Sequence, residues 1–298
     1  IVSFSGGRTS AYLCHAMKKI HGDNVDFIFF NTGAEHPKTY EFIKKVNKEF
    51  DLNLTCLQVD INKNGHHRKN KNSYSIVDIN SMSCNLSAFS DVMGRYGRPS
   101  FGMASCTREM KSKVSNKYVK DNYLKGEFSV WLGIRIDEPK RINLENKDSL
   151  RYMAEVSDFD KQDVLDWWSA MPFDLEIDEH LGNCVFCVKK SIIKVALAAR
   201  DEPALAEEWA GALNDANNRD DLTNPTYRAG NAVGVIYRGY NSFGSIIKMF
   251  SEHSRGEIES RIRGGKNNDS NSCSESCEAF GQQDMFNELD NQKVMKST

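Results

Sequence analysis

Short apolar runs alternate with amphipathic segments over the first part of the chain. Residues 1–4 and 25–30 are nearly continuous apolar runs, which are typical of strands covered on both faces, and residues 54–61 alternate as a third strand. Between these runs, apolar side chains recur at helical spacing over residues 11–20 and 40–50. This strand and helix order predicts an α/β fold with a doubly wound parallel sheet and right-handed crossovers.

The later chain is less regular. Residues 62–105 are polar and irregular, so we expect them to form an insertion that covers the ligand site of the sheet rather than a sheet element. Residues 128–134 are apolar enough for a fourth strand, and residues 192–213 have helical periodicity. From Arg263 the sequence "RGGKNNDSNS" is typical of a flexible linker. The chain therefore divides into an α/β domain over 1–200, a C-terminal helical extension over 201–262 and a flexible tail over 263–298.

Composition excludes some classes of protein. The 298 residues are 40% hydrophobic and 27% charged, which is ordinary for a globular protein. Because no apolar run approaches the roughly 20 residues of a membrane span, we expect no membrane association and a cytoplasmic location. The formal net charge of −2 gives no global electrostatic case for nucleic acid. One local basic stretch, "NKNGHHRKNKN" at 62–72, is either a solvated loop or a contact for a polyanionic partner.

The stretch "SFSGGRTS" joins the first strand to the first helix. Consecutive small residues at a helix N-terminus leave backbone N–H groups directed at one point, and two glycines let an anion approach them closely. Hydroxyl groups and one arginine can add donors. The spacing of a Walker loop is absent. We therefore predict a phosphate-binding loop made by Ser5, Gly6, Gly7, Arg8, Thr9 and Ser10.

Further polar residues follow other strands of the predicted sheet. Ligands of such sheets bind beyond the carboxyl ends of the strands, where Thr32 and Gly33 should join the loop. Arg135 and Arg141 follow the fourth strand, and they are either anion ligands or members of surface ion pairs. The acidic residues between these two arginines, Asp137 and Glu138, are candidates for holding Mg²⁺ against phosphates.

The cysteines are the second strong signal. The chain has eight, and in a cytosolic protein their spacing indicates metal binding or catalysis before disulfides. Cys184 and Cys187 form a C-x-x-C pair, and Cys106 lies upstream beside the cation Lys111. Such thiolates suit an iron–sulfur cluster or zinc, and the alternative is a set of unligated thiols.

Five motifs in order resemble one family. The S-G-G-x-x-S loop is similar to the pyrophosphate loop of the adenine-nucleotide α-hydrolase superfamily, which includes ATP pyrophosphatases and phosphoadenosine phosphosulfate (PAPS) reductases. "NTGAEHPKTYEF", "SCTREMK", "WLGIRIDEPKR" and the segment from "DFDKQDVLDWW" to "GNCVFC" resemble successive PAPS reductase motifs. The chain looks most like the phage and prophage members. The resemblance assigns the nucleotide-binding role to the domain over 1–200.

The resemblance also implies a chemistry. One version is thiol-dependent reduction of a sulfonucleotide to sulfite, in which a tail cysteine, Cys273 or Cys277, attacks the sulfonate with Arg135, Arg141 and Lys111 assisting. The other is cleavage of ATP between its α and β phosphates to activate an acceptor for sulfur transfer. The intact Gly6-Gly7 pair favours a triphosphate, whereas ATP pyrophosphatases usually carry Asp at the position of Thr9.

Related adenylylsulfate reductases use a Cys-Cys pair and a C-x-x-C to hold a [4Fe–4S] cluster. In this chain Ser105 replaces the first cysteine of the pair, so the resemblance matches three ligands, Cys106, Cys184 and Cys187. Cys84, Cys273 or Cys277 would supply the fourth ligand. The partners implied are an adenine nucleotide, ATP or PAPS, and a sulfur donor or a thioredoxin-like reductant. A non-catalytic nucleotide-binding module whose cluster senses redox state is the alternative of a different class.

Overall fold

A six-stranded sheet organises the computed structural model, which describes residues 1–62, 72–124, 128–142, 149–215, 217–218 and 237–264. The strand order is β4-β3-β2-β1-β5-β6, and every neighbouring pair is parallel except the antiparallel pair β3 and β4. The strands are β1 (Val2–Phe4), β2 (Phe27–Asn31), β3 (Thr55–Asp60), β4 (Ser73–Val77), β5 (Val130–Leu132) and β6 (Leu150–Tyr152). The predicted α/β fold with a doubly wound parallel sheet is confirmed.

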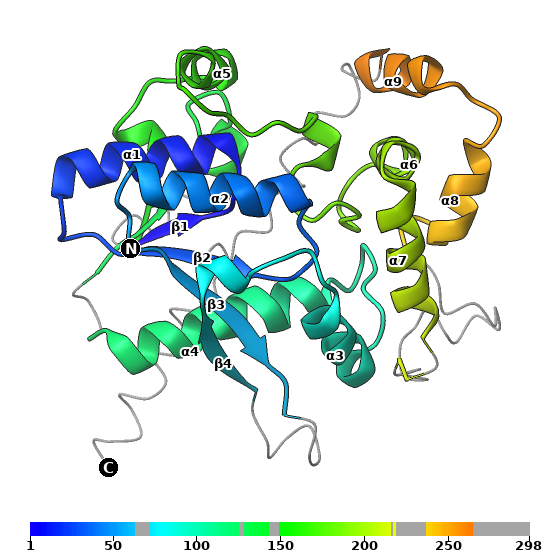
Figure 1. Ribbon diagram of the computed structural model, residues 1–298, viewed down its shortest axis with the longest axis horizontal. Helices are drawn as coiled ribbons and strands as arrows, with labels where there is room; N and C mark the ends of the chain where they lie inside the picture. The colour runs from blue at the N-terminus through cyan, green and yellow to red at the C-terminus, as the bar shows by residue number, and fades with distance from the viewer. Residues whose placement is uncertain (63–71, 125–127, 143–148, 216, 219–236, 265–298) are drawn as a thin grey trace.

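Helices cover both faces of this sheet (Figure 1). Phe27 and Phe29 of β2 share a buried cluster with α1, α2 and α5, whereas Ile28 and Phe30 share the other with α3, α4, α6 and α7. This alternation follows from the two-residue period of a strand. The helices are α1 (Arg8–His21), α2 (Pro37–Glu49), α3 (Ser87–Tyr96), α4 (Lys113–Asn122), α5 (Lys161–Ser169), α6 (Ile192–Asp201), α7 (Pro203–Asn214), α8 (Phe243–Met249) and α9 (Arg255–Gly264).

The region 62–105 was predicted to be an insertion without sheet structure, and this prediction is wrong. It contributes β4, which pairs with β3 in the register Val59↔Tyr74, and it also contributes α3. β4 lies at the edge of the sheet and its residues are half-buried or exposed, so it lacks the apolar run that marks an inner strand. Pro203 begins α7 and divides the predicted helical stretch 192–213 into two helices, because proline cannot donate the hydrogen bond of a helix interior.

The helical extension shares a core with the α/β domain. Trp209 of α7 and Phe243 of α8 lie in the same buried cluster as Leu57 and Val130 of the sheet. Trp209 packs edge-on against Phe89 of α3, with ring centroids 4.9 Å apart. The extension is therefore packed against the α/β domain. Trp209 of α7 also lines the pocket that contains Cys106, Cys184 and Cys187. The predicted tail from residue 265 onward lies outside the described residues, as does most of the basic stretch 62–72.

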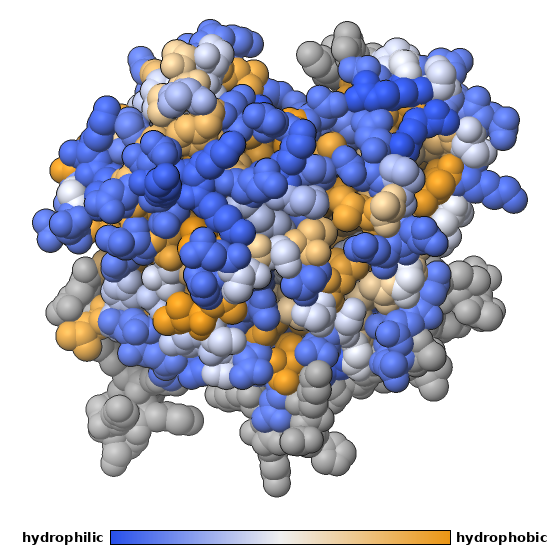
Figure 2. All heavy atoms as spheres, viewed as in Figure 1, coloured by the Kyte–Doolittle hydropathy of each residue, from blue (hydrophilic) through white to orange (hydrophobic). Residues whose placement is uncertain are grey.

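Surface properties agree with the composition. The face of the molecule in Figure 2 is mainly hydrophilic, with apolar residues in small groups. Among the described helices, none has both the length and the apolar character needed to cross a membrane.

Candidate functional site

The loop between β1 and α1 contains two glycines with different roles. Gly6 has φ +83°, and a Cβ on it would lie 3.1 Å from Thr39 Cγ2 and 3.2 Å from Ile43 Cδ1, so the fold itself requires glycine there. Gly7 precedes α1 with an ordinary φ of −98°. A Cβ on Gly7 would have only Ser5 Oγ nearby, at 3.7 Å. The second glycine therefore leaves open the space through which a ligand would approach the backbone.

Hydroxyl groups hold this loop in shape. Ser10 Oγ accepts a hydrogen bond from Ser5 N at 3.1 Å, lies 2.8 Å from Ser5 Oγ and donates to Gly7 O at 3.1 Å. A Cβ on Gly133, just after β5, would come within 3.0 Å of Ser10 Cα, so the end of β5 lies directly against the start of α1. The loop is preorganised at the N-terminus of α1, where the helix dipole and unbonded N–H groups favour an anion.

Arg135 brings positive charge to the loop. Its Nη1 donates to Thr9 Oγ1 at 3.2 Å, and its Nε donates to Asp137 Oδ1 at 2.8 Å. Arg141 lies on the same turn and pairs with Glu138 at 2.7 Å. Asp137 and Glu138, the two candidates for binding Mg²⁺, are thus each in an ion pair with an arginine. Either carboxylate would have to release its arginine in order to bind a metal ion.

Arg8 makes different contacts. Its Nε donates to Asp174 Oδ1 at 2.7 Å, and its Nη2 donates to Asp174 Oδ2 at 2.9 Å and to the carbonyl oxygen of Leu175. This bidentate pair fixes the start of α1 to the segment before η6 (Glu179–Leu181). We therefore leave Arg8 out of the proposed phosphate ligands.

The turn between β2 and α2 contains a buried acid, Glu35, that sequence reasoning missed. Thr32 Oγ1 donates to Glu35 Oε1 at 2.9 Å, and Tyr40 OH donates to Glu35 Oε2 at 2.8 Å. Cys184 Sγ lies 3.6 Å from Glu35 Oε1. Burial, followed by the Glu35 charge, raises the pKa of Tyr40, so that its hydroxyl remains a donor. The available signal was the position of Glu35 directly after a buried strand.

Three of the predicted metal ligands line one small pocket. Cys106, Cys184 and Cys187 share it with Thr32 and Lys111, and apolar side chains that include Phe186 and Trp209 complete the wall. Thr32 follows the strand next to β1, so this cysteine pocket lies at the same edge of the sheet as the Gly6-Gly7 loop. Cys84 is not among the residues that line this pocket.

The spacing of the three thiols bears on the metal. A tetrahedral zinc site with Zn–S bonds of about 2.3 Å places its sulfurs roughly 3.8 Å apart. Among the described residues, the His, Cys, Asp and Glu group whose ligand atoms all lie within 4.8 Å of one another is Asp178, His180 and Asp201. Cys106, Cys184 and Cys187 are not in this group, so their three sulfurs do not all lie within 4.8 Å of one another.

Lys111 reaches the cysteine pocket from an unusual helical turn. Cys106 directly precedes a π-helix, η2 (Thr107–Ser112), which continues into α4. Within that turn Glu109 is fully buried and accepts from Arg108 at 2.7 Å and from Lys113 at 2.8 Å. The wider π turn places Cys106 and Lys111 on the same pocket, and such turns occur frequently at functional sites.

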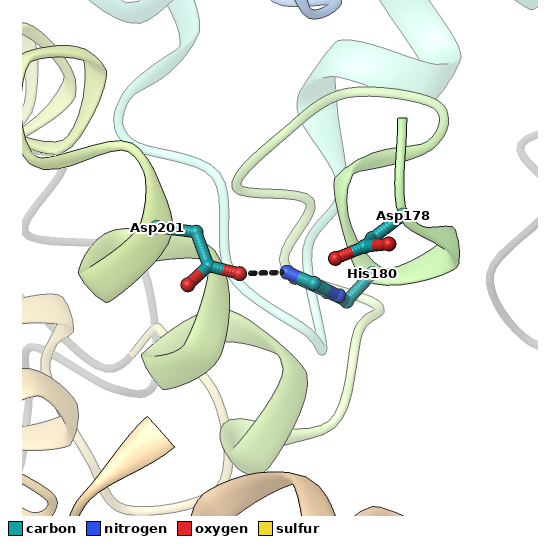
Figure 3. Close-up of side chains that lie close together, drawn as sticks. All are labelled: Asp178, His180 and Asp201. Atoms are coloured by element: carbon teal, nitrogen blue, oxygen red, sulfur yellow. Dashed lines mark hydrogen bonds and ion pairs between the residues drawn. The ribbon is translucent and has the colours of Figure 1, made fainter. Parts of the chain in front are cut away.

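Asp178, His180 and Asp201 lie close together, and His180 contacts Asp201 (Figure 3). His180 Nε2 lies 2.8 Å from Asp201 Oδ2, and Arg255 of α9 donates to Asp201 at 2.9 Å and to Asp178 at 2.7 Å. Burial lowers the pKa of His180, while Asp201 acts in the opposite direction. Because Arg255 already supplies the positive charge to both carboxylates, we assign the group to the attachment of α9.

The Cys84 thiol is expected to react slowly. Burial, followed by the charges of Glu208 and Glu35, raises its pKa from 9.0 to about 11. Below both values, each unit of pKa lowers the thiolate fraction about tenfold, so alkylation by iodoacetamide at pH 8 should be about 100-fold slower than for an ordinary thiol. The rate should keep rising with pH until about 11. Mass spectrometry of the Cys84 peptide measures this, and a rate that levels off near pH 9 contradicts it.

Comparisons with known proteins show the family of this chain. The family model of the phosphoadenosine phosphosulfate reductase domain matches residues 1–152, which contain the Gly6-Gly7 loop, Thr32 and Cys106. The chain belongs to this phosphoadenosine phosphosulfate reductase family. It is 42% identical over 285 residues to the uncharacterized nin region protein ORF290 of Escherichia phage lambda, covering 95% of this chain and 96% of that protein.

A shorter similarity reaches an archaeal protein. An uncharacterized protein of Methanocaldococcus jannaschii is 41% identical over 56 residues, which are 19% of this chain and 13% of that protein. The resemblance to the PAPS reductase family is confirmed, and with it the class of nucleotide-related sulfur chemistry. C-terminal to the family match, Cys184, Cys187 and Trp209 add the second half of the cysteine pocket.

Proposed function

We propose that this protein binds ATP through the loop at residues 5–10, cleaves it between the α and β phosphates, and so activates an acceptor for sulfur transfer. An acceptor oxygen attacks the α phosphorus, pyrophosphate leaves, and a sulfur nucleophile then displaces AMP. The observation that carries the proposal is the open space at Gly7. Since the fold does not require glycine at this position, its absent side chain is explained by the close approach of a ligand to the backbone.

Each side chain of the proposed site has a physical role. The N–H groups at the start of α1 and the guanidinium of Arg135 stabilise the negative charge that develops on the phosphates. Ser5 and Thr9 add hydroxyl donors. Thr32 and Gly33 follow β2 beside the loop. Arg141 pairs with Glu138 and so holds this carboxylate in the turn that also carries Arg135. Mg²⁺ would require a carboxylate there to exchange its arginine.

The cysteine pocket supplies the sulfur side of the proposed reaction. Cys106, Cys184 and Cys187 would hold a [4Fe–4S] cluster, which would bind sulfur or transfer electrons. Lys111 places a positive charge beside the thiols and favours their deprotonated, ligating form. Cys273 or Cys277 would complete the ligand set in place of Cys84, which does not line this pocket. The two tail cysteines lie outside the described residues.

A second candidate function is reduction of a sulfonucleotide such as PAPS. The match to the PAPS reductase family model favours it. In this version Cys273 or Cys277 would attack the sulfonate sulfur, the adenosine phosphate would leave, and a thioredoxin-like reductant would release sulfite. Arg135 and Lys111 would then bind the sulfonate.

Thermal stabilisation by ATP and by PAPS distinguishes the two. A ligand at about 100 times its dissociation constant adds roughly 2.7 kcal/mol to the free energy of unfolding. We expect anaerobically purified protein to be stabilised by ATP more than by PAPS at equal concentration. Stronger stabilisation by PAPS would favour the reductase instead, and stabilisation by neither would contradict nucleotide binding.

Gly7→Ser provides the matched variant for the loop. Serine is a good N-cap, so the free protein should melt within a degree or two of the wild type. The added side chain would occupy the ligand's approach, so we expect ATP stabilisation to fall by at least about 1.4 kcal/mol, which corresponds to tenfold weaker binding. Unchanged ATP stabilisation in Gly7→Ser would remove the observation on which the proposal rests.

A further inference from the structure

Two tight turns beside the cysteine pocket expose aromatic rings. One turn is closed by the bridge between Ser100 and Met103, and the other by the bridge between Arg238 and Asn241. Phe101 lies on the first turn and is 51% exposed, while Tyr240 lies on the second and is 98% exposed. Exposed rings that are gathered at one place on a surface indicate a candidate interaction site, whereas single scattered ones do not.

The two turns form one surface. Phe101 N donates to Tyr237 O at 2.9 Å, which joins them through their backbones. The guanidinium carbon of Arg238 lies 4.2 Å from the centroid of the Phe101 ring, and Arg238 Nη1 donates to Lys189 O at 2.7 Å. Arg238 is therefore fixed over Phe101. We call Phe101, Arg238 and Tyr240 the aromatic turn surface.

The inner side of the same turns belongs to the cysteine pocket. Pro99, just before the first turn, lines that pocket with Cys106. Tyr237, at the start of the second turn, donates its hydroxyl to Phe186 O and accepts from Trp209 Nε1 at 3.1 Å. The aromatic turn surface is thus the outer side of a wall whose inner side faces the thiols.

We propose that the aromatic turn surface binds unpaired bases of a single-stranded nucleic acid. Exposed aromatic rings stack on the faces of bases whatever the sequence, and the stacked cation of Arg238 adds attraction for both a base and a phosphate. Small residues on both turns, Gly102 and Gly239, leave the rings accessible from outside. The surface would hold a nucleic acid against the wall of the cysteine pocket.

Fluorescence anisotropy with labelled oligonucleotides tests this binding without any turnover. We expect single-stranded oligo(dT) and oligo(U) to bind, and the matching duplex to bind more weakly because its bases are paired. Stacking is worth about 1–3 kcal/mol per base, so Phe101→Ala and Tyr240→Ala should each weaken binding about 5- to 150-fold. Tyr240→Phe keeps the ring and should bind like the wild type.

Leu124→Ala is the matched control, because Leu124 is 68% exposed. It should leave binding unchanged, and melting curves should confirm that every variant is folded. No binding of either single strand would overturn the proposal, as would equal binding of the duplex or unchanged binding in Phe101→Ala and Tyr240→Ala. The result is independent of the proposed nucleotide chemistry, since ATP stabilisation in the same variants should stay at the wild-type level.

Discussion

Gly33→Ala should destabilise the protein by about 2 to 5 kcal/mol, the sum of a left-handed backbone penalty of about 1–2 kcal/mol and an overpacking cost of about 1–3 kcal/mol. Gly33 has φ +75°, and a Cβ on it would lie 1.9 Å from the carbonyl oxygen of Asn85. Because the opposing atom belongs to the backbone, the clash can be relieved only by moving the chain. Chemical denaturation of the wild type and the variant measures the difference.

Gly22→Ala is the control that separates the two costs. Gly22 has φ +60°, but a Cβ on it would meet nothing within 4 Å. Its φ of +60° and ψ of −123° are rare for residues other than glycine, so Gly22→Ala should lose only this backbone contribution of about 1–3 kcal/mol. If Gly33→Ala were no more destabilising than Gly22→Ala, the close approach of β2's end to Asn85 would be wrong. A shift of the chain at Gly33 would also displace Thr32 and Glu35, because all three residues lie in the turn after β2.

Cys184→Ser should remove most of the iron from anaerobically purified protein. We expect about four irons per wild-type chain, as a [4Fe–4S] cluster requires, and a brown colour. Cys184 supplies one of the thiols of the cysteine pocket, and serine is a poor ligand for a cluster that is held by thiolates. Cys106→Ser and Cys187→Ser should have the same effect. Iron and zinc analysis of the purified variants makes the measurement.

Cys84→Ser is the matched control for that series. Cys84 is partly exposed, is not among the residues that line the cysteine pocket, and has a thiol pKa raised to about 11, so it is a poor source of thiolate. We expect this variant to retain its iron, with the fourth ligand coming from the tail or from outside the protein. Equal iron loss in Cys84→Ser and Cys184→Ser would make Cys84 a ligand, and a colourless wild type that contains zinc would exclude the cluster.

The sequence by itself determined the fold class and the order of the motifs. Apolar runs at residues 1–4 and 25–30 predicted inner strands because a strand covered on both faces has no polar side. The Gly6-Gly7 pair predicted the loop that joins β1 to α1, and phosphate binding by that loop stays a prediction. The C-x-x-C spacing and the position of Cys106 predicted cysteines that share one site. The strands and the loop are local patterns, which the sequence displays directly. Placing Cys106 with the distant C-x-x-C pair rested instead on the resemblance to adenylylsulfate reductases.

Other features depended on tertiary structure. β4 and β6 were missed because neither is a continuous apolar run: the residues of β4 are half-buried or exposed, and β6 has Arg151 at its centre. Each is defined by its neighbour in the sheet rather than by its own composition. The burial of Glu35 beside Cys184 and the ion pair of Arg8 with Asp174 join residues far apart in the chain. The sequence alone likewise does not distinguish the role of Gly6 from the role of Gly7. Only the packed neighbours decide that one glycine serves the fold while the other leaves room for a ligand.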